Sequence, residues 1–228
     1  MIAFIFDMDG VIFDSERLYL DCCVEIAETL GMDHIVEAIH RCIGVTTDVT
    51  KMILMETYRD RELVDRFRNL SVALVREKIR NGLLEMKPGV RELLDYLQAA
   101  GCSIALASST QTDIVEKELS DAGLRDYFSA VVGGDQAKRS KPDPDIFLKA
   151  AELLEREPTD CIVLEDSFNG IRAAKAAGMT AIMVPDLLQP DEEIAAIADL
   201  VMPSLLDVME KIKERDFLEI RQKKTQTL

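Results

Sequence analysis

The sequence has no tryptophan, only two histidines and no apolar run long enough to cross a membrane. Its five cysteines form no CxxC pair, and neither His34 nor His40 stands at a spacing that would complete a zinc site with them. We therefore expect reduced, mostly buried cysteines and no zinc. The apolar segment 2–6 is too short for a signal peptide, so we expect a cytoplasmic protein.

Basic residues are also scarce, with 27 lysines and arginines against 42 aspartates and glutamates and a formal net charge of -15. Such a surface repels nucleic-acid backbones and anionic membranes, so we predict neither as a partner. No feature of the sequence indicates a protein partner. An acidic protein that handles phosphates needs a local positive charge, which a divalent cation or a well-placed lysine can supply.

Short apolar runs of strand length alternate with segments of helical periodicity over most of the chain. Runs that are apolar on both faces suit a parallel sheet covered by helices on both sides. We therefore predict an α/β fold with a doubly wound parallel sheet. The expected strands are 2–6, 103–107, 130–132, 162–164 and 180–184, and the expected helices between the later strands lie within 90–97, 114–119, 144–155 and 168–177.

The interval between the first two strands breaks this alternation. It contains helical apolar stripes, such as Leu63, Phe67, Leu70 and Leu74, and no convincing strand. Such stripes can be buried by packing helix on helix in a small bundle. We therefore predict an α/β core domain of residues 1–14 and 83–228 and an inserted, all-helical cap domain of residues 15–82.

Polar residues stand where the predicted strands end, at the edge where open parallel sheets bind their ligands. Each cluster alone has an ordinary explanation as a helix cap, a turn or a solvated loop. Together they offer oxygen ligands for a hard cation, hydroxyl groups for a phosphate and one ammonium group. The clusters are Asp7 and Asp9, then Ser108-Ser109-Thr110, then Lys141 before a helix, and finally Glu165-Asp166.

The order FDMDG, ASS, SKPDP and LEDSFNGI resembles the four signature motifs of the haloacid-dehalogenase superfamily, over nearly the whole chain. The helical insert resembles the cap of the subgroup that includes beta-phosphoglucomutase and related small-metabolite phosphatases. The resemblance implies that Asp7 is a nucleophile that forms an aspartyl-phosphate and that Asp9 is a general acid and base. It also implies phosphate binding by Ser108, Ser109 and Lys141, and Mg²⁺ binding by Asp7, the main-chain carbonyl of Asp9, Glu165 and Asp166.

Two cap positions separate the functions that this resemblance allows. Where the mutase has histidine and arginine, this chain has Tyr19 and Thr47, and residues 44–47 resemble the cap loop that reaches the substrate in relatives. Without the arginine, the second phosphate of a sugar bisphosphate loses its bidentate partner. We therefore predict a phosphatase for a small phosphorylated metabolite, with Tyr19 and Thr47 as candidate substrate contacts and a sugar-phosphate mutase as the alternative. A binding protein without catalysis is disfavoured because it would not need both Asp7 and Asp9.

Overall fold

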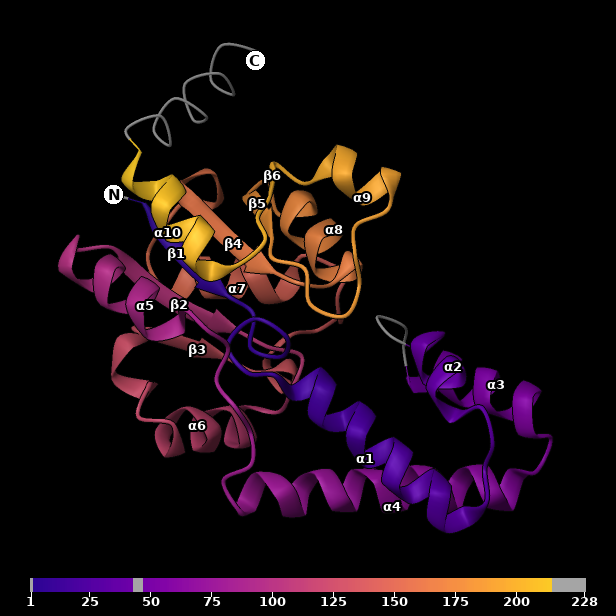
Figure 1. Ribbon diagram of the computed structural model, residues 1–228. Coiled ribbons are helices and arrows are strands. Elements are labelled where there is room, and N and C mark those ends of the chain that lie inside the picture. The colour runs from indigo at the N-terminus through magenta and orange to yellow at the C-terminus, as the bar shows by residue number, and fades with distance from the viewer. Residues whose placement is uncertain (1, 43–46, 215–228) are drawn as a thin grey trace. The chain divides into compact units, whose positions relative to one another are not determined.

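The computed structural model describes residues 2–42 and 47–214. A six-stranded parallel sheet with the order β3-β2-β1-β4-β5-β6 forms the centre of its larger part (Figure 1). The predicted doubly wound α/β fold is thereby confirmed. The strands are β1 (Ala3–Phe6), β2 (Ser103–Ala107), β3 (Ala130–Val132), β4 (Cys161–Glu165), β5 (Thr180–Met183) and β6 (Leu200–Val201).

Helices cover the sheet on both faces because its strands are apolar on both faces. Ala3 and Ile5 of β1 belong to a buried cluster with residues of α7 and α8, while Phe4 and Phe6 point to the opposite face and are also buried. The helices of this part are α5 (Val90–Ala99), α6 (Thr112–Asp121), α7 (Asp145–Leu153), α8 (Phe168–Ala176), α9 (Glu192–Ile197) and α10 (Leu205–Lys213), with 3₁₀ turns η1 (Arg125–Tyr127), η2 (Gly134–Gln136) and η3 (Pro158–Asp160).

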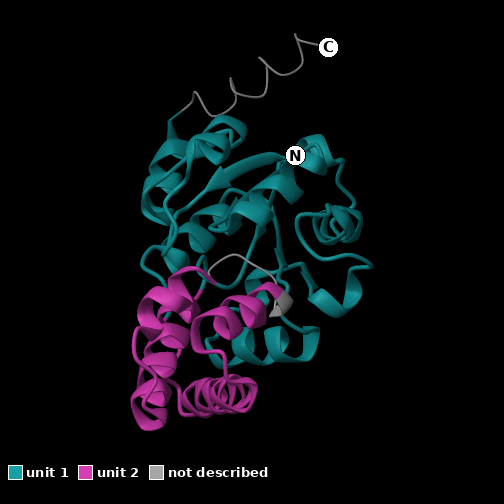
Figure 2. Ribbon diagram, turned by 90° about the vertical axis from the view of Figure 1, so that its right-hand side faces the viewer, with its two compact units in different colours: residues 1–12, 86–228 teal, residues 13–85 magenta. Residues whose placement is uncertain are grey.

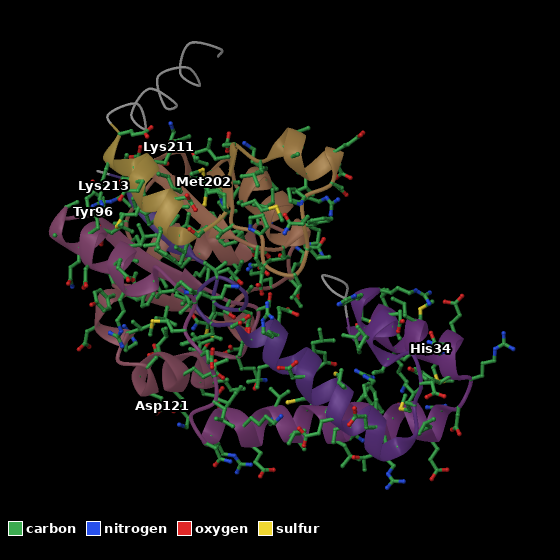
Figure 3. The ribbon with its side chains drawn as sticks, in the orientation of Figure 1. His34, Tyr96, Asp121, Met202, Lys211 and Lys213 are labelled. Atoms are coloured by element: carbon green, nitrogen blue, oxygen red, sulfur yellow. The ribbon has the colours of Figure 1, made fainter. Side chains whose placement is uncertain are left out.

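The last helix, α10, packs against α5 on one side of the sheet. Gly89, which precedes α5, has a φ of 87°, and a Cβ there would lie 3.0 Å from the main-chain nitrogen of Leu206. The ammonium group of Lys213 lies 5.6 Å from the ring centroid of Tyr96 in α5 (Figure 3). The first turn of α10 therefore lies close to Gly89, the residue before α5, and its last residue lies close to Tyr96 of α5.

The chain divides into two compact units, one of residues 1–12 and 86–228 and the other of residues 13–85 (Figure 2). In the second unit α4 packs against α1 and α3, and its buried face is Val64, Phe67 and Ser71. Leu70, which the sequence pattern placed on that face, is 37% exposed. No helix among the described residues is long and apolar enough to span a membrane. The helices of this unit are α1 (Ser15–Leu30), α2 (Ile35–His40), α3 (Thr47–Tyr58) and α4 (Arg61–Arg80).

Candidate active site

Asp7 and Lys141 meet at the carboxyl ends of β1, β2 and β4. Asp7 directly follows β1, and its main-chain N–H donates to the carbonyl of Leu164 in β4 at 2.9 Å. The Nζ atom of Lys141 lies 2.6 Å from Oδ1 of Asp7 and 2.7 Å from Oε1 of Glu165. All three side chains are buried, with 8% or less of each exposed. The first, third and fourth sequence clusters are thus brought together by ion pairs.

Four groups surround the ammonium of Lys141. Besides the two carboxylates, it donates to the carbonyl of Ala107 at 3.4 Å and lies 4.9 Å from the ring centroid of Phe147. Burial by itself would lower the pKa of Lys141, but the charges of Asp7 and Glu165 outweigh burial and raise this pKa. Lys141 therefore keeps its positive charge at neutral pH.

Asp7, Glu165 and Asp166 form a group of carboxylates that suits a metal ion. Each offers one oxygen, and these oxygens all lie within 4.8 Å of one another. Glycines make room for two of them, because a Cβ at Gly10 would lie 2.2 Å from Oδ2 of Asp166 and one at Gly170 would lie 1.7 Å from Oε1 of Glu165. The other oxygen of Glu165, Oε2, accepts the main-chain N–H of Ser167 at 2.6 Å.

The charge balance at this edge also favours a bound cation. Asp7, Asp9, Glu165 and Asp166 bring four carboxyl groups, and Lys141 brings one ammonium group. Burial, with help from Glu165 and Asp9, raises the pKa of Asp7 to about 8, and Lys141 offsets this only in part. A divalent cation with oxygen ligands would stabilise the ionised form of Asp7 and reduce the excess of negative charge.

Asp9 faces the loop that follows β2. Its Oδ2 atom lies 3.0 Å from the hydroxyl of Thr110 and 3.4 Å from the hydroxyl of Ser108. The main-chain N–H of Thr110 also donates to the Ser108 hydroxyl at 3.0 Å. Ser108 is fully buried, whereas the side chain of Ser109 is exposed. The sequence motifs gave Thr110 no role, although it stands in the same Ser-Ser-Thr cluster.

The turn after β3 packs against the loop that follows β2. Gly134 donates its N–H to the carbonyl of Thr110 at 2.8 Å, and a Cβ at Gly134 would lie 2.2 Å from the carbonyl oxygen of Ser109. Oδ1 of Asp135 accepts both the main-chain N–H and the hydroxyl of Thr112, each at 2.7 Å. Asp135 thereby gives the main-chain N–H of the first residue of α6 an acceptor, although it is not the N-cap residue.

The two candidate substrate contacts of the cap lie in the other unit. Tyr19, in α1, is half-buried against the apolar core of that unit, where burial and the neighbouring Cys23 raise its pKa. Thr47 is the first residue of α3, but its side chain and residues 44–46 lie outside the described part of the chain. Contact of either residue with a substrate stays a prediction.

The family model described as "Haloacid dehalogenase-like hydrolase" matches residues 4–184. The chain is 37% identical to the "Phosphorylated carbohydrates phosphatase" of Thermotoga maritima over 80% of this chain and 84% of that protein. It is 31% identical to "Hexitol phosphatase B" of Escherichia coli, over 92% and 96%. A solved structure of a Clostridium difficile beta-phosphoglucomutase is similar with a TM-score of 0.70 and 26% identity, over 99% of each chain.

Proposed function

The chain belongs to the haloacid dehalogenase-like hydrolases, and from that premise we propose that it is a Mg²⁺-dependent phosphatase acting on a small phosphorylated carbohydrate. The observation that carries the proposal is the group in which Lys141 pairs with Asp7 and Glu165, the two carboxylates that stand at the ends of the adjacent strands β1 and β4. The named activities of the Thermotoga maritima and Escherichia coli relatives support the substrate class.

Asp7 is the proposed nucleophile. One of its carboxylate oxygens forms a bond to phosphorus while the bond from phosphorus to the ester oxygen breaks, which gives an aspartyl-phosphate and an alcohol. Water then attacks phosphorus and releases inorganic phosphate and the Asp7 carboxylate. In the proposed mechanism Lys141, held by Asp7 and Glu165, neutralises charge on the transferring oxygens, and the buried hydroxyl of Ser108 donates to one of them.

Asp9 is the proposed general acid and base. In the first step it gives a proton to the ester oxygen that leaves, and in the second it takes one from the attacking water. Its carboxylate is held by the loop after β2, next to the Ser108 hydroxyl. Asp9→Asn should therefore retain substrate binding while losing most turnover, and a rate within about twofold of wild type would remove Asp9 from this role.

Mg²⁺ would be held by Asp7, Glu165 and Asp166, whose oxygens lie within reach of one ion, together with the main-chain carbonyl of Asp9. When bound, the ion supplies positive charge that favours the ionised nucleophile and attracts a phosphate dianion to a protein of net charge -15. The predicted cap of residues 15–82 falls within the compact unit of residues 13–85, and in the proposed function it would supply contacts to the rest of the substrate and limit the access of water.

A sugar-phosphate mutase is the second candidate, because a beta-phosphoglucomutase is among the similar solved structures. Tyr19 and Thr47 favour hydrolysis, since neither offers the guanidinium that would hold a second phosphate. Beta-glucose 1-phosphate with catalytic glucose 1,6-bisphosphate separates the two functions. Glucose 6-phosphate formed much faster than free phosphate would reverse this ranking.

The proposed function is tested with purified protein, Mg²⁺ and a panel of sugar and sugar-alcohol phosphates, nucleotides and glycolate phosphate. We expect phosphate release from at least one carbohydrate ester, and none from the same mixture with Asp7→Asn protein or with excess chelator. Turnover confined to nucleotides would contradict the substrate class. Undiminished turnover in excess chelator would contradict the metal dependence.

A further inference from the structure

Oxygen Oδ2 of Asp9 receives two hydroxyl contacts, and the shorter one comes from a residue outside the signature motifs. Thr110 Oγ1 lies 3.0 Å from it and Ser108 Oγ lies 3.4 Å from it. An ionised carboxylate can only accept hydrogen bonds, so both hydroxyls must be the donors. Hydrogen bonds from a donor to a charged acceptor are about twice as strong as neutral ones.

The hydroxyls of Thr110 and Ser108 cannot both donate a hydrogen bond to Asp9 once a phosphate is bound. Each hydroxyl has a single proton to donate. In the proposed function the Ser108 hydroxyl turns to the transferring phosphoryl oxygens and can no longer donate to Asp9. Thr110 is then the hydroxyl of this loop that stays on Oδ2, where its contact is already within ordinary hydrogen-bond length.

Thr110 is itself fixed by its surroundings, as a group that positions another must be. Its carbonyl accepts the N–H of Gly134 at 2.8 Å, and its own N–H donates to Ser108 Oγ at 3.0 Å. Thr112, two residues after Thr110, donates its main-chain N–H and its hydroxyl to Oδ1 of Asp135. The Thr110 main chain thus has a defined place between two neighbouring turns.

We propose that Thr110 is a positioning residue whose hydroxyl holds Oδ2 of Asp9 and so directs Oδ1 to the leaving oxygen of the substrate. The proposal rests on the proposed function, in which Asp9 is the general acid. Because Oδ2 accepts the hydrogen bond from Thr110, the proton of the acid form is favoured on Oδ1. That proton moves to the ester oxygen as its bond to phosphorus breaks, and Oδ1 later takes a proton from the attacking water.

The test compares Thr110→Val, which replaces the hydroxyl with a methyl group of similar size, and Thr110→Ser, which keeps the hydroxyl. Each is assayed with 4-nitrophenyl phosphate, whose leaving group departs without protonation, and with the carbohydrate phosphate that wild type hydrolyses fastest. For Thr110→Val, kcat/KM should fall about tenfold or more on the carbohydrate ester and less than about threefold on the nitrophenyl ester. Thr110→Ser should stay within about threefold of wild type on both.

Thr29→Val is the matched control, because Thr29 is an exposed residue of α1 whose hydroxyl donates to the carbonyl of Glu25 in the same helix. This variant should match wild type on both esters. Thermal unfolding without metal confirms the fold, and Thr110→Ala replaces Thr110→Val if the latter does not fold. An equal loss on both esters, no loss on either, or no rescue by Thr110→Ser would overturn the proposal. Wild-type protein that hydrolyses neither ester would overturn the proposed function and this inference with it.

Discussion

Replacing Glu118 should make the protein more stable, by an amount that depends on pH. Glu118 lies on the buried face of α6 beside Val115 and Leu119 and is only 8% exposed. Burial raises its pKa from 4.5 to about 7, and the charges of Asp9 and Asp121 act in the same direction, while Lys117 opposes them. The folded chain therefore holds a proton on this group over a pH range in which the unfolded chain does not.

The sign and size of the effect of Glu118 on the free energy of unfolding follow from proton linkage. Where the folded state binds more protons, the free energy of unfolding falls as pH rises, so the stability present below pH 4.5 is lost progressively up to about pH 7. Between about pH 5.5 and about pH 7, the free energy of unfolding falls by about 1.4 kcal/mol for each of roughly 1.5 pH units, which amounts to about 2 kcal/mol. Glu118→Gln removes the ionisable group with little change in shape and should avoid this loss.

Urea unfolding of wild type and Glu118→Gln, followed by circular dichroism at about pH 5.5 and about pH 8, measures the effect. The advantage of the variant should be about 2 kcal/mol larger at the higher pH. Glu92→Gln, the same change at an exposed position of α5, is the matched control. Its free energy of unfolding should differ from that of wild type by the same amount at both pH values. A Glu118→Gln advantage that does not change with pH would refute the reasoning.

Three further predictions concern the carboxylate group. Asp7→Asn should keep the circular dichroism spectrum of wild type and lose phosphate release, because an amide does not attack phosphorus; normal turnover would exclude Asp7 as nucleophile. Ca²⁺ added to the Mg²⁺ enzyme should inhibit it, since Ca²⁺ uses the same oxygens at higher coordination, and full activity in Ca²⁺ alone would count against this site. Gly170→Ala, whose Cβ would overlap Oε1 of Glu165, should lower the free energy of unfolding by about 1–3 kcal/mol and reduce kcat, whereas a wild-type melting temperature would show that Glu165 can move.

The parts of the fold that could be predicted from the sequence are those with a repeated local signal. The runs that became β1 to β5 are apolar on both faces, and polar clusters stand at the ends of β1, β2 and β4. In contrast, β6 (Leu200–Val201) and α9 (Glu192–Ile197) are too short to show a period and were missed. The face of α4 was also misjudged, because Ser71 takes a buried place on the helix and Leu70 does not.

Some residues of the candidate site could be predicted from the sequence, and others could not. Lys141, Asp7 and Glu165 stand in recognisable motifs, and the structure brings the ammonium of Lys141 within hydrogen-bond distance of both carboxylates. The contact between Thr110 and Asp9 joins residues 101 positions apart, so only the folded chain reveals it. Glu118 did leave a local signal, because it is a charged residue on an otherwise apolar helical stripe.

The central claim, that Asp7 carries the phosphoryl group, is tested most directly by trapping the intermediate. Protein quenched during turnover of the best substrate and treated with borohydride should contain homoserine in place of Asp7, which mass spectrometry of the N-terminal peptide detects, since hydride reduces an acyl phosphate and not a free carboxylate. Protein quenched without substrate is the control and should keep an unmodified Asp7. Homoserine at another aspartate, or an unmodified Asp7 while phosphate is still being released, would contradict the account.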